Sequence, residues 1–289
     1  MEIITIITPT YNRVKLLPRL FNSLLNQKRY NFEWLIIDDG STDNTEYVVS
    51  TFKTDYFHIR YFKKENGGKH TALNLSFKHI NTELSFIVDS DDYLLPDATL
   101  TIEEDWKKYK RHDLCGISYL RGYSANTVIG DICSKDYCID SFINMRFNKH
   151  INGDKAEVWV TKYLTEYQFP EIPGEKFFGE SYIWIMMAKK RDMLFRNKII
   201  YITEYIEGGL SKSGRALRIK CPLGGMISSE IIMTSEFSLY HRIKGGIAYC
   251  CYFFFSSKRG YLRLRKHCLL KLICFVPGFF LYLIWKRYK

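Results

Sequence analysis

The sequence lacks cysteines at the spacing that holds a structural zinc ion. Its eight cysteines include no C-x-x-C pair, and their positions along the 289 residues show no regular repeat. Zinc sites and disulfide frameworks both need grouped cysteines. We therefore expect free thiols in a reducing cytoplasm and no zinc site.

No export signal is recognisable in the N-terminal region. The opening run MEIITIITPT has no basic residue ahead of its apolar stretch and no small-residue cleavage site. The stretch is short and rich in β-branched residues, which favour strands. Residues 3–9 are therefore predicted to form the first strand.

Acidic residues are absent from the region 237–289. This region holds eleven Lys and Arg residues, whereas residues 1–236 hold 31 basic and 31 acidic ones, so the tail accounts for the whole net charge of +11. Its basic residues are mixed with apolar runs such as CLLKLICFV and GFFLYLIW. Such a mixture suits a membrane surface better than a phosphate groove, and we expect no nucleic-acid partner.

The first half of the chain contains a regular alternation of strand and helix patterns. Apolar or β-branched runs at 3–9, 32–38, 58–63 and 84–88 are separated by helical spacing of apolar residues at 12–27, 45–53 and 69–80. This alternation predicts βαβ units, and therefore an α/β fold with a mostly parallel sheet flanked by helices.

Each predicted strand of this half runs into a polar cluster: TPTYNR, DDGSTDNT, ENGGKH and DSDD, in chain order. Any one of them is compatible with a solvated turn, because Asp, Asn and Gly are common turn formers. The carboxyl ends of parallel strands meet at one edge of a sheet, where α/β folds bind ligands. The helix-to-strand joints at the other edge are plainer, so the four clusters together predict a binding site.

Over about residues 1–110, these clusters resemble the nucleotide-binding half of family 2 glycosyltransferases, which have the Rossmann-like GT-A fold. TPTYNR is similar to the motif that contacts the nucleoside, in which Tyr11 either stacks on the base or packs under the loop. Asp39 matches the residue that faces the base or ribose. The string ENGGKHTALN matches the pattern N-x-G-x-x-x-A-x-N, and DSDD supplies the family's D-x-D at Asp89 and Asp91.

The resemblance implies a nucleotide-sugar donor bound by Pro9, Tyr11, Asp39, Asn66, Gly68, Lys69, Asp89, Ser90 and Asp91. Sugar transfer leaves negative charge on a diphosphate, which a divalent cation stabilises. Mg²⁺ and Mn²⁺ take hard carboxylate oxygens, so we assign Asp91 to the metal and Asp89 to the ribose or a metal-bound water. Lys69 is either a diphosphate ligand or a solvated lysine. Asp92 and Asp97 are interpreted as capping or solvated residues.

The second half resembles the family's acceptor region at residues 169–190, where turn residues lead into a helix. An inverting transfer needs a carboxylate to take the proton of the acceptor hydroxyl, and the resemblance implies Glu180 as this general base. Glu175 and Glu171 are the next candidates. An acid favoured by the dipole of a helix N-terminus is the alternative interpretation of Glu180, and Ser181 stands where the family usually has an acid. Residues 199–220 resemble a strand and loop that close over the donor.

The function predicted is an inverting, metal-dependent glycosyltransferase that moves one sugar, from a UDP-sugar, to a cell-envelope or capsular acceptor. Single-sugar addition is favoured because the Q-x-x-R-W string of processive polysaccharide synthases is absent. The alternatives are a sugar-1-phosphate nucleotidyltransferase and a non-catalytic sugar- or membrane-binding protein. The predicted units are a donor half at 1–110, an acceptor half at 111–236 and a helical membrane-associating tail at 237–289.

The tail segment 268–285 has eighteen residues, one charge and a Pro-Gly pair near its middle. A spanning helix needs about 20 apolar residues, and Lys271 with Pro277 favours an interfacial hairpin instead. Basic flanks on both sides suit a segment that lies on the cytoplasmic leaflet. We therefore expect a cytoplasmic protein, peripheral on the inner face of the plasma membrane and acting on a lipid-linked acceptor. A core helix pair or an oligomer contact is the alternative.

Overall fold

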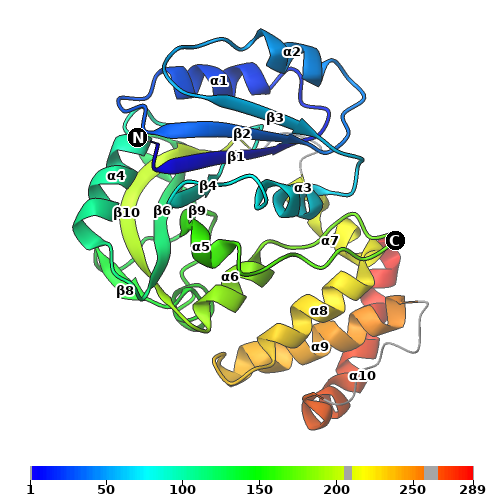
Figure 1. Cartoon of the computed structure of the whole chain (residues 1–289). Helices are drawn as coiled ribbons and strands as arrows, with labels where there is room; N and C mark the ends of the chain where they lie inside the picture. Colours follow the sequence, from blue (N-terminus) through cyan, green and yellow to red (C-terminus); the bar gives the residue numbers. More distant parts are fainter. Residues whose placement is uncertain (1, 205–209, 257–265, 289) are drawn as a thin grey trace.

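The computed structural model describes residues 2–204, 210–256 and 266–288, and it shows a mixed sheet flanked by helices with a helical unit at one end (Figure 1). The strand order is β3-β2-β1-β4-β9-β6-β10-β5. Two further short strands, β7 (Thr127–Val128) and β8 (Cys138–Asp140), pair with β6 and β10. The predicted α/β class is confirmed.

Four strands form the parallel part of the sheet: β1 (Ile4–Thr10), β2 (Phe32–Asp38), β3 (Ile59–Lys63) and β4 (Leu84–Ile87). Every residue of β1, β2 and β4 is buried. Helices α1 (Leu17–Leu25) and α2 (Thr45–Thr51) cover one face and α3 (Lys69–Ser76) the other (Figure 1). Coverage on both faces explains the near-continuous apolar runs of these strands.

The first helix begins later than the predicted range of 12–27. Pro18 has no backbone N–H and a fixed φ, so it is accommodated in the first turn of α1. Asn12 has a φ of 53°, and its Oδ1 accepts a hydrogen bond from the backbone N–H of Thr42 at 2.8 Å. The segment before α1 is therefore a loop tied to the second polar cluster.

The second half of the chain completes the same sheet. Strand β9 (Lys155–Val160) is antiparallel to β4 and to β6 (Leu114–Ser124), and β10 (Asp192–Ile202) runs parallel to β6. The edge strand is β5 (Tyr93–Leu94), followed by α4 (Ala98–Tyr109). Two short helices, α5 (Thr161–Leu164) and α6 (Ser181–Ala188), complete this half. Trp159 of β9 stacks on Trp184 of α6 at 4.5 Å between ring centroids, which fixes α6 against the sheet.

The C-terminal unit consists of α7 (Leu210–Lys220), α8 (Pro222–Ile232), α9 (Leu239–Phe255) and α10 (Cys268–Trp285), with a final 3₁₀ turn at Lys286–Tyr288. It has its own small apolar core, made of Met226, Met233, Tyr249, Cys250, Tyr252 and Cys274. Residues 210–220 were predicted to be part of a loop after β10, and this prediction is wrong: they form helix α7. The segment is rich in Leu, Ala, Arg and Lys, which are strong helix formers. Residues 205–209 lie outside the described residues.

Helix α10 continues through Pro277, so the predicted hairpin within 268–285 is wrong. Gly278, which follows Pro277, lies where α10 packs against α9 and does not form a turn. A Cβ on Gly278 would lie 2.4 Å from Cβ of Cys250, so only glycine lets α9 and α10 approach this closely. Residues near the start of α9 contact the middle of α10, and Tyr252 contacts Trp285, so the two helices run in the same general direction.

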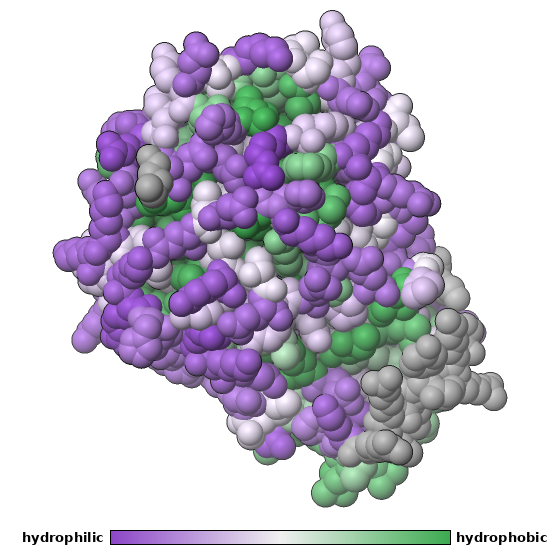
Figure 2. Space-filling model, viewed as in Figure 1, coloured by the Kyte–Doolittle hydropathy of each residue, from purple (hydrophilic) through white to green (hydrophobic). Residues whose placement is uncertain are grey.

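One side of α10 is apolar and uncovered. Its exposed residues include Leu269, Leu272, Ile273, Val276, Phe280, Leu283 and Ile284. Its single lysine, Lys271, is buried and forms an ion pair with Glu230 of α8 at 2.6 Å. Within the described residues, α10 is the one helix that is long and apolar enough to cross a membrane by length and composition. Figure 2 shows apolar atoms gathered over the helical unit, while hydrophilic residues cover most of the sheet domain on this face.

Candidate active site

The structure brings the four polar clusters together at the carboxyl ends of β1 to β4. Asn12 of the first cluster donates its backbone N–H to Ser41 of the second at 2.9 Å. Asn66 of the third donates to the backbone oxygen of Asp39 at 2.9 Å. Lys69, which follows the Gly pair, forms an ion pair with Asp89 of the fourth. This contact network joins clusters that are up to 80 residues apart in the sequence.

Asp39 organises the loop that leads into α3. Its Oδ1 accepts hydrogen bonds from Gly67 N and Lys64 Nζ, both at 2.9 Å. Its Oδ2 accepts from Gly68 N at 2.7 Å and from Asn66 Nδ2 at 3.1 Å. These four donors occupy the carboxylate, and they hold the turn in which Gly68 has a φ of 99°. The predicted contact of Asp39 with the base or ribose stays a prediction.

Gly68 is also the point where the second half of the chain crosses over the site. A Cβ at Gly68 would lie 2.0 Å from the backbone oxygen of Lys176, so any side chain here would displace the segment around Lys176. Lys176 Nζ in turn donates to Asn66 Oδ1 at 2.8 Å. On the same segment, Asn74 pairs with the backbone N–H and oxygen of Phe169, at 2.8 and 2.9 Å. The pattern N-x-G-x-x-x-A-x-N thus positions the segment 169–176.

Lys69 joins the DSDD turn to the start of α6. Its Nζ forms ion pairs with Asp89 and, at 2.6 Å, with Oε1 of Glu180. Burial opposes the charge of Lys69, but the two carboxylates raise its pKa overall. Burial likewise opposes the charge of Asp89, and Lys69 and Arg121 together lower its pKa below the usual range. Lys69 and Asp89 thus each favour the charged form of the other.

Glu180 lies at the N-cap of α6, and no capping hydrogen bond from its side chain forms there. Its Oε1 is buried and lies 2.6 Å from Nζ of Lys69, so an ion pair holds this oxygen. The other two candidate bases are engaged in structure. Glu175 accepts the backbone N–H groups of Leu223 and Gly224 at 2.8 Å each, which caps α8, and Glu171 accepts from Asn74 at 2.7 Å. Of the three, Glu180 is the carboxylate that shares Lys69 with Asp89 of the D-x-D turn.

The last carboxylate of DSDD is buried, so the interpretation of Asp92 as capping or solvated is wrong. Burial, followed by the charge of Asp89, raises the pKa of Asp92 to about 7. Tyr201 of β10 donates its hydroxyl to Asp92 Oδ2 at 2.7 Å and accepts the backbone N–H of Asp89 at 2.9 Å. The guanidinium of Arg121 lies 4.0 Å above the ring of Tyr201 and 3.5 Å from Asp92 Oδ2. This unit holds the D-x-D turn from behind, since a buried carboxylate is stable only when paired.

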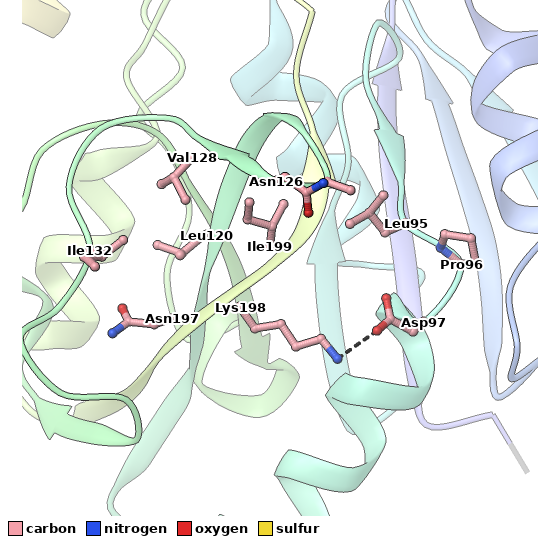
Figure 3. Close-up of a pocket in the computed structure, with 11 residues that line it drawn as sticks. Leu95, Pro96, Asp97, Leu120, Asn126, Val128, Ile132, Asn197, Lys198 and Ile199 are labelled. Carbon is pink, nitrogen blue, oxygen red and sulfur yellow. Dashed lines mark ion pairs between the residues drawn. The ribbon is translucent and has the colours of Figure 1, made fainter.

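Asp97 lies away from these carboxylates. It forms an ion pair with Lys198 at 2.8 Å, at the side of a shallow cavity of about 690 Å³ that Leu95, Ile132 and Ile199 also line (Figure 3). Asp97 stands at the N-cap of α4, but its side chain makes no capping hydrogen bond there.

Asp91 is the member of the D-x-D whose carboxylate is open. Its backbone oxygen accepts from Arg19, but its side chain makes no hydrogen bond or ion pair with the residues that the structure describes. No group of three His, Cys, Asp or Glu residues is placed to hold a metal in the described ranges. Mg²⁺ and Mn²⁺ at nucleotide sites need one or two carboxylates, and substrate phosphates and water supply the other ligands. The open carboxylate of Asp91 fits such an ion.

The remaining predicted donor residues lie at the same edge. Tyr11 is 45% exposed there, Ser90 is buried within the DSDD turn, and Pro9 is buried in β1. Their contacts with a donor stay predictions.

Sequence reasoning missed Arg121, Tyr201 and Glu157, which come from β6, β10 and β9. Glu157 lies within electrostatic range of Glu180, Arg121 and Arg146. Burial raises the pKa of Glu157 to about 7. The two arginines act in the opposite direction and lower this pKa, whereas the charge of Glu180 raises it further. Arg121 and Glu157 are charged residues at partly buried strand positions, and Tyr201 is a fully buried hydroxyl-bearing residue. A polar group at such a position is the one signal that marks them in the sequence.

A family model described as "Glycosyl transferase family 2" matches residues 5–164. An uncharacterised glycosyltransferase, MG025 of Mycoplasma genitalium, is 29% identical over 202 residues, which cover 68% of this chain and 60% of the relative. The GalNAc(5)-diNAcBac-PP-undecaprenol beta-1,3-glucosyltransferase of Campylobacter jejuni is 28% identical over 186 residues, 56% of this chain and 60% of the relative. The chain thus spans about 60% of the length of these curated relatives.

Two solved structures share the fold. S. aureus TarS in complex with UDP-GlcNAc superposes with a TM-score of 0.63 at 19% identity, over 96% of this chain and 79% of that one. The mannosyltransferase PcManGT of Pyrobaculum calidifontis, in complex with GDP-Man and Mn²⁺, gives 0.60 at 17% identity, over 99% and 86%. At these identities the likeness shows the fold alone.

Proposed function

Because this chain belongs to glycosyl transferase family 2, we propose that it transfers a single sugar from a nucleotide sugar to a cell-envelope glycan, with inversion at the anomeric carbon. One observation carries the proposal: Lys69 holds the D-x-D residue Asp89 and the carboxylate of Glu180 in one ion-pair cluster. Donor ligands and a general base must meet at the anomeric carbon in such a reaction.

The chemical step is a displacement. The acceptor oxygen forms a bond to the anomeric carbon, the bond from that carbon to the diphosphate oxygen breaks, and the nucleoside diphosphate leaves with the electron pair. The carboxylate of Glu180 takes the proton of the acceptor hydroxyl. Lys69 holds the carboxylate of Glu180 in place and neutralises part of the diphosphate charge as it develops.

Asp91 is the proposed ligand of a divalent cation, Mg²⁺ or Mn²⁺, and Asp89 turns toward the ribose or a metal-bound water. Bound there, the ion would stabilise the charge of the leaving diphosphate. Arg121 and Tyr201 fix the turn that presents both carboxylates. The Mn²⁺ in the PcManGT complex supports the choice of ion on this fold.

The proposed donor is a UDP-sugar, which the UDP-GlcNAc complex of TarS supports. The proposed acceptor is a lipid-linked glycan of the cell envelope or capsule. The Campylobacter jejuni relative, whose name specifies an undecaprenol-linked substrate, supports this choice.

We place the protein on the inner face of the plasma membrane, held by the uncovered side of α10. Lys271 no longer opposes membrane contact, since it faces Glu230 inside the helical unit. Apolar residues cover the opposite side, and the flanking stretches of 237–289 are basic without any acid. Each Lys or Arg near an anionic leaflet contributes about 1 kcal/mol to binding.

A screen of nucleotide sugars tests the function. The full-length protein, with Mn²⁺ or Mg²⁺, should hydrolyse one UDP-sugar slowly and gain thermal stability with it, because a ligand that binds the folded state raises the unfolding temperature. Stabilisation without any turnover would indicate the non-catalytic alternative. Release of pyrophosphate from a nucleoside triphosphate and a sugar phosphate would indicate the nucleotidyltransferase alternative. Either result would overturn the proposal.

A further inference from the structure

A large groove separates the sheet domain from the helical unit. Its volume is about 1190 Å³. The wall on the sheet side comes from residues 146–152 and 177–185, and the opposite wall comes from α7, α8, α9 and the end of α10. The donor clusters after β1 to β4 contribute no residue to this groove among those described. It is therefore a separate space beside the candidate active site.

The groove reaches the candidate base. Gly179 and Ser181, the two neighbours of Glu180 in the chain, both line it. Glu180 itself points toward Lys69 and the D-x-D turn. A molecule in the groove would thus have one end next to the carboxylate that deprotonates an acceptor.

The charge of the lining is of one sign. Arg146, Arg218 and Lys244 line the groove, and no Asp or Glu does so in the described ranges. Arg146 is tied to the protein, since it donates to the backbone oxygens of Ile151 and Gly153 at 2.6 Å each. Arg218 and Lys244 are exposed, come from α7 and α9, and form no ion pair with described residues. Lys244 lies over the ring of Tyr240, 5.9 Å from its centroid. Two cations that no described carboxylate neutralises suit a ligand with more than one negative charge.

The rest of the lining is largely apolar. Ile185, Ile231, Ile247 and Ala248 lie along it, and Leu281 with Trp285 continues it to α10. The uncovered apolar side of α10 belongs to the same helix as Leu281 and Trp285. A hydrocarbon chain that leaves the groove along α10 would therefore stay in contact with apolar surface.

We propose that this groove binds the lipid carrier of the acceptor, an isoprenoid chain that ends in a diphosphate. Arg218 and Lys244 contact the diphosphate, the first isoprenoid units lie against the apolar wall, and the attached sugar reaches Glu180. A diphosphate can share its charges between two cations, whereas the phosphodiester of an ordinary phospholipid carries one charge. The inference rests on the proposed function, because it assigns a site to the proposed acceptor.

Binding of farnesyl diphosphate to the full-length protein in a mild non-ionic detergent tests the site. Farnesol and inorganic diphosphate, each lacking one half of the ligand, serve as comparison probes. Farnesyl diphosphate should bind at least about ten-fold more tightly than either, because both halves of the groove contribute. The double variant Arg218→Gln/Lys244→Gln should lose about ten-fold in affinity for farnesyl diphosphate, since charged hydrogen bonds are lost. Its affinity for farnesol should not change.

A second variant tests the apolar half independently. Ser228 lines the groove on α8 and makes no hydrogen bond through its side chain with described residues. Ser228→Trp should fill the space and weaken farnesyl diphosphate about ten-fold, whereas Ser228→Ala should not. Lys53→Gln, at an exposed position outside the groove, is the matched control for the charge changes. Thermal unfolding of each variant identifies any that fails to fold.

Failure of this inference differs from failure of the proposed function. Unchanged farnesyl diphosphate affinity in both groove variants, with wild-type hydrolysis of the nucleotide sugar, would overturn the groove assignment alone. Equal affinity for inorganic diphosphate and farnesyl diphosphate would reduce the groove to an anion site and also overturn it. Displacement of farnesyl diphosphate by anionic phosphatidylglycerol vesicles at equal lipid concentration would also overturn the groove assignment. Loss of farnesyl diphosphate binding in the variants, with nucleotide-sugar hydrolysis retained, would support it.

Discussion

The ammonium group of Lys69 lies 2.6 Å from Oε1 of Glu180, so a cation at the start of α3 neutralises the carboxylate at the start of α6. The two residues are separated by more than 100 positions in the chain. Since Lys69 also pairs with Asp89, one side chain connects the donor turn to the candidate base.

Asp91→Ala should abolish sugar transfer and remove the metal-dependent part of nucleotide affinity, because the open carboxylate of Asp91 is the proposed metal ligand. Nucleotide binding should be measured with Mn²⁺ and with EDTA. Asp97→Ala is the matched control, since Asp97 pairs with Lys198 away from the site. Full transfer activity of the Asp91→Ala protein, or of wild type in EDTA, contradicts the assignment.

Glu180→Gln should lower kcat by roughly 10²–10⁴ and leave donor affinity nearly unchanged, because it keeps the size of the side chain and removes the proton acceptor. Single-turnover transfer and donor titration separate the two effects. Glu175→Gln is the control. It weakens the cap of α8, so it should lower the unfolding temperature and have little effect on kcat. Transfer by Glu180→Gln within a few-fold of wild type would move the base elsewhere, with Glu157 as the next candidate.

Glu157 should make the stability of the fold fall as pH rises. Burial and Glu180 raise its pKa from the ordinary 4.5 to about 7, so between these values the folded protein keeps a proton that the unfolded chain releases. The free energy of unfolding therefore decreases with pH across this window, by on the order of 1–3 kcal/mol. Glu157→Gln should flatten the decrease, as measured by urea unfolding from pH 4.5 to 8, whereas the exposed Glu104→Gln should not. An unchanged slope in Glu157→Gln would refute this origin.

The uncovered side of α10 should decide membrane binding. Leu272 and Val276 are 72% and 60% exposed on that side, so Leu272→Asp/Val276→Asp should leave the fold intact and abolish flotation with anionic liposomes. Tyr47→Asp, at an equally exposed position on α2, adds a charge elsewhere and should float like wild type. Flotation should also weaken with salt, because the basic flanks are solvent-exposed charges. A wild-type protein that stays in the soluble fraction would refute the anchor.

Much of the fold of residues 1–110 follows from sequence pattern alone. The runs ITIITPT and FEWLIID are apolar throughout because helices cover both faces of the parallel sheet, and such runs are readable without coordinates. Parallel strands place their carboxyl ends at one edge, so the order of the polar clusters already implied that Asn12, Asp39, Asn66 and Asp89 would converge. Local chemistry limited the detail: Pro18 and the left-handed Asn12 moved the start of α1 from 12 to 17.

Tertiary structure decided which carboxylates are free to act. Glu171, Glu175 and Glu180 are alike in sequence, and the contacts with Asn74, with the N-terminus of α8 and with Lys69 distinguish them. In the sequence Asp92 looks like one more turn residue. In the structure it contacts Tyr201 and Arg121, which are more than 25 positions away in the chain. In the tail, Lys271 reads as a charge against membrane contact until Glu230 pairs with it. Periodicity reports which face of an element is buried, but the partner of a buried charge comes from another part of the chain, and only packing brings the two together.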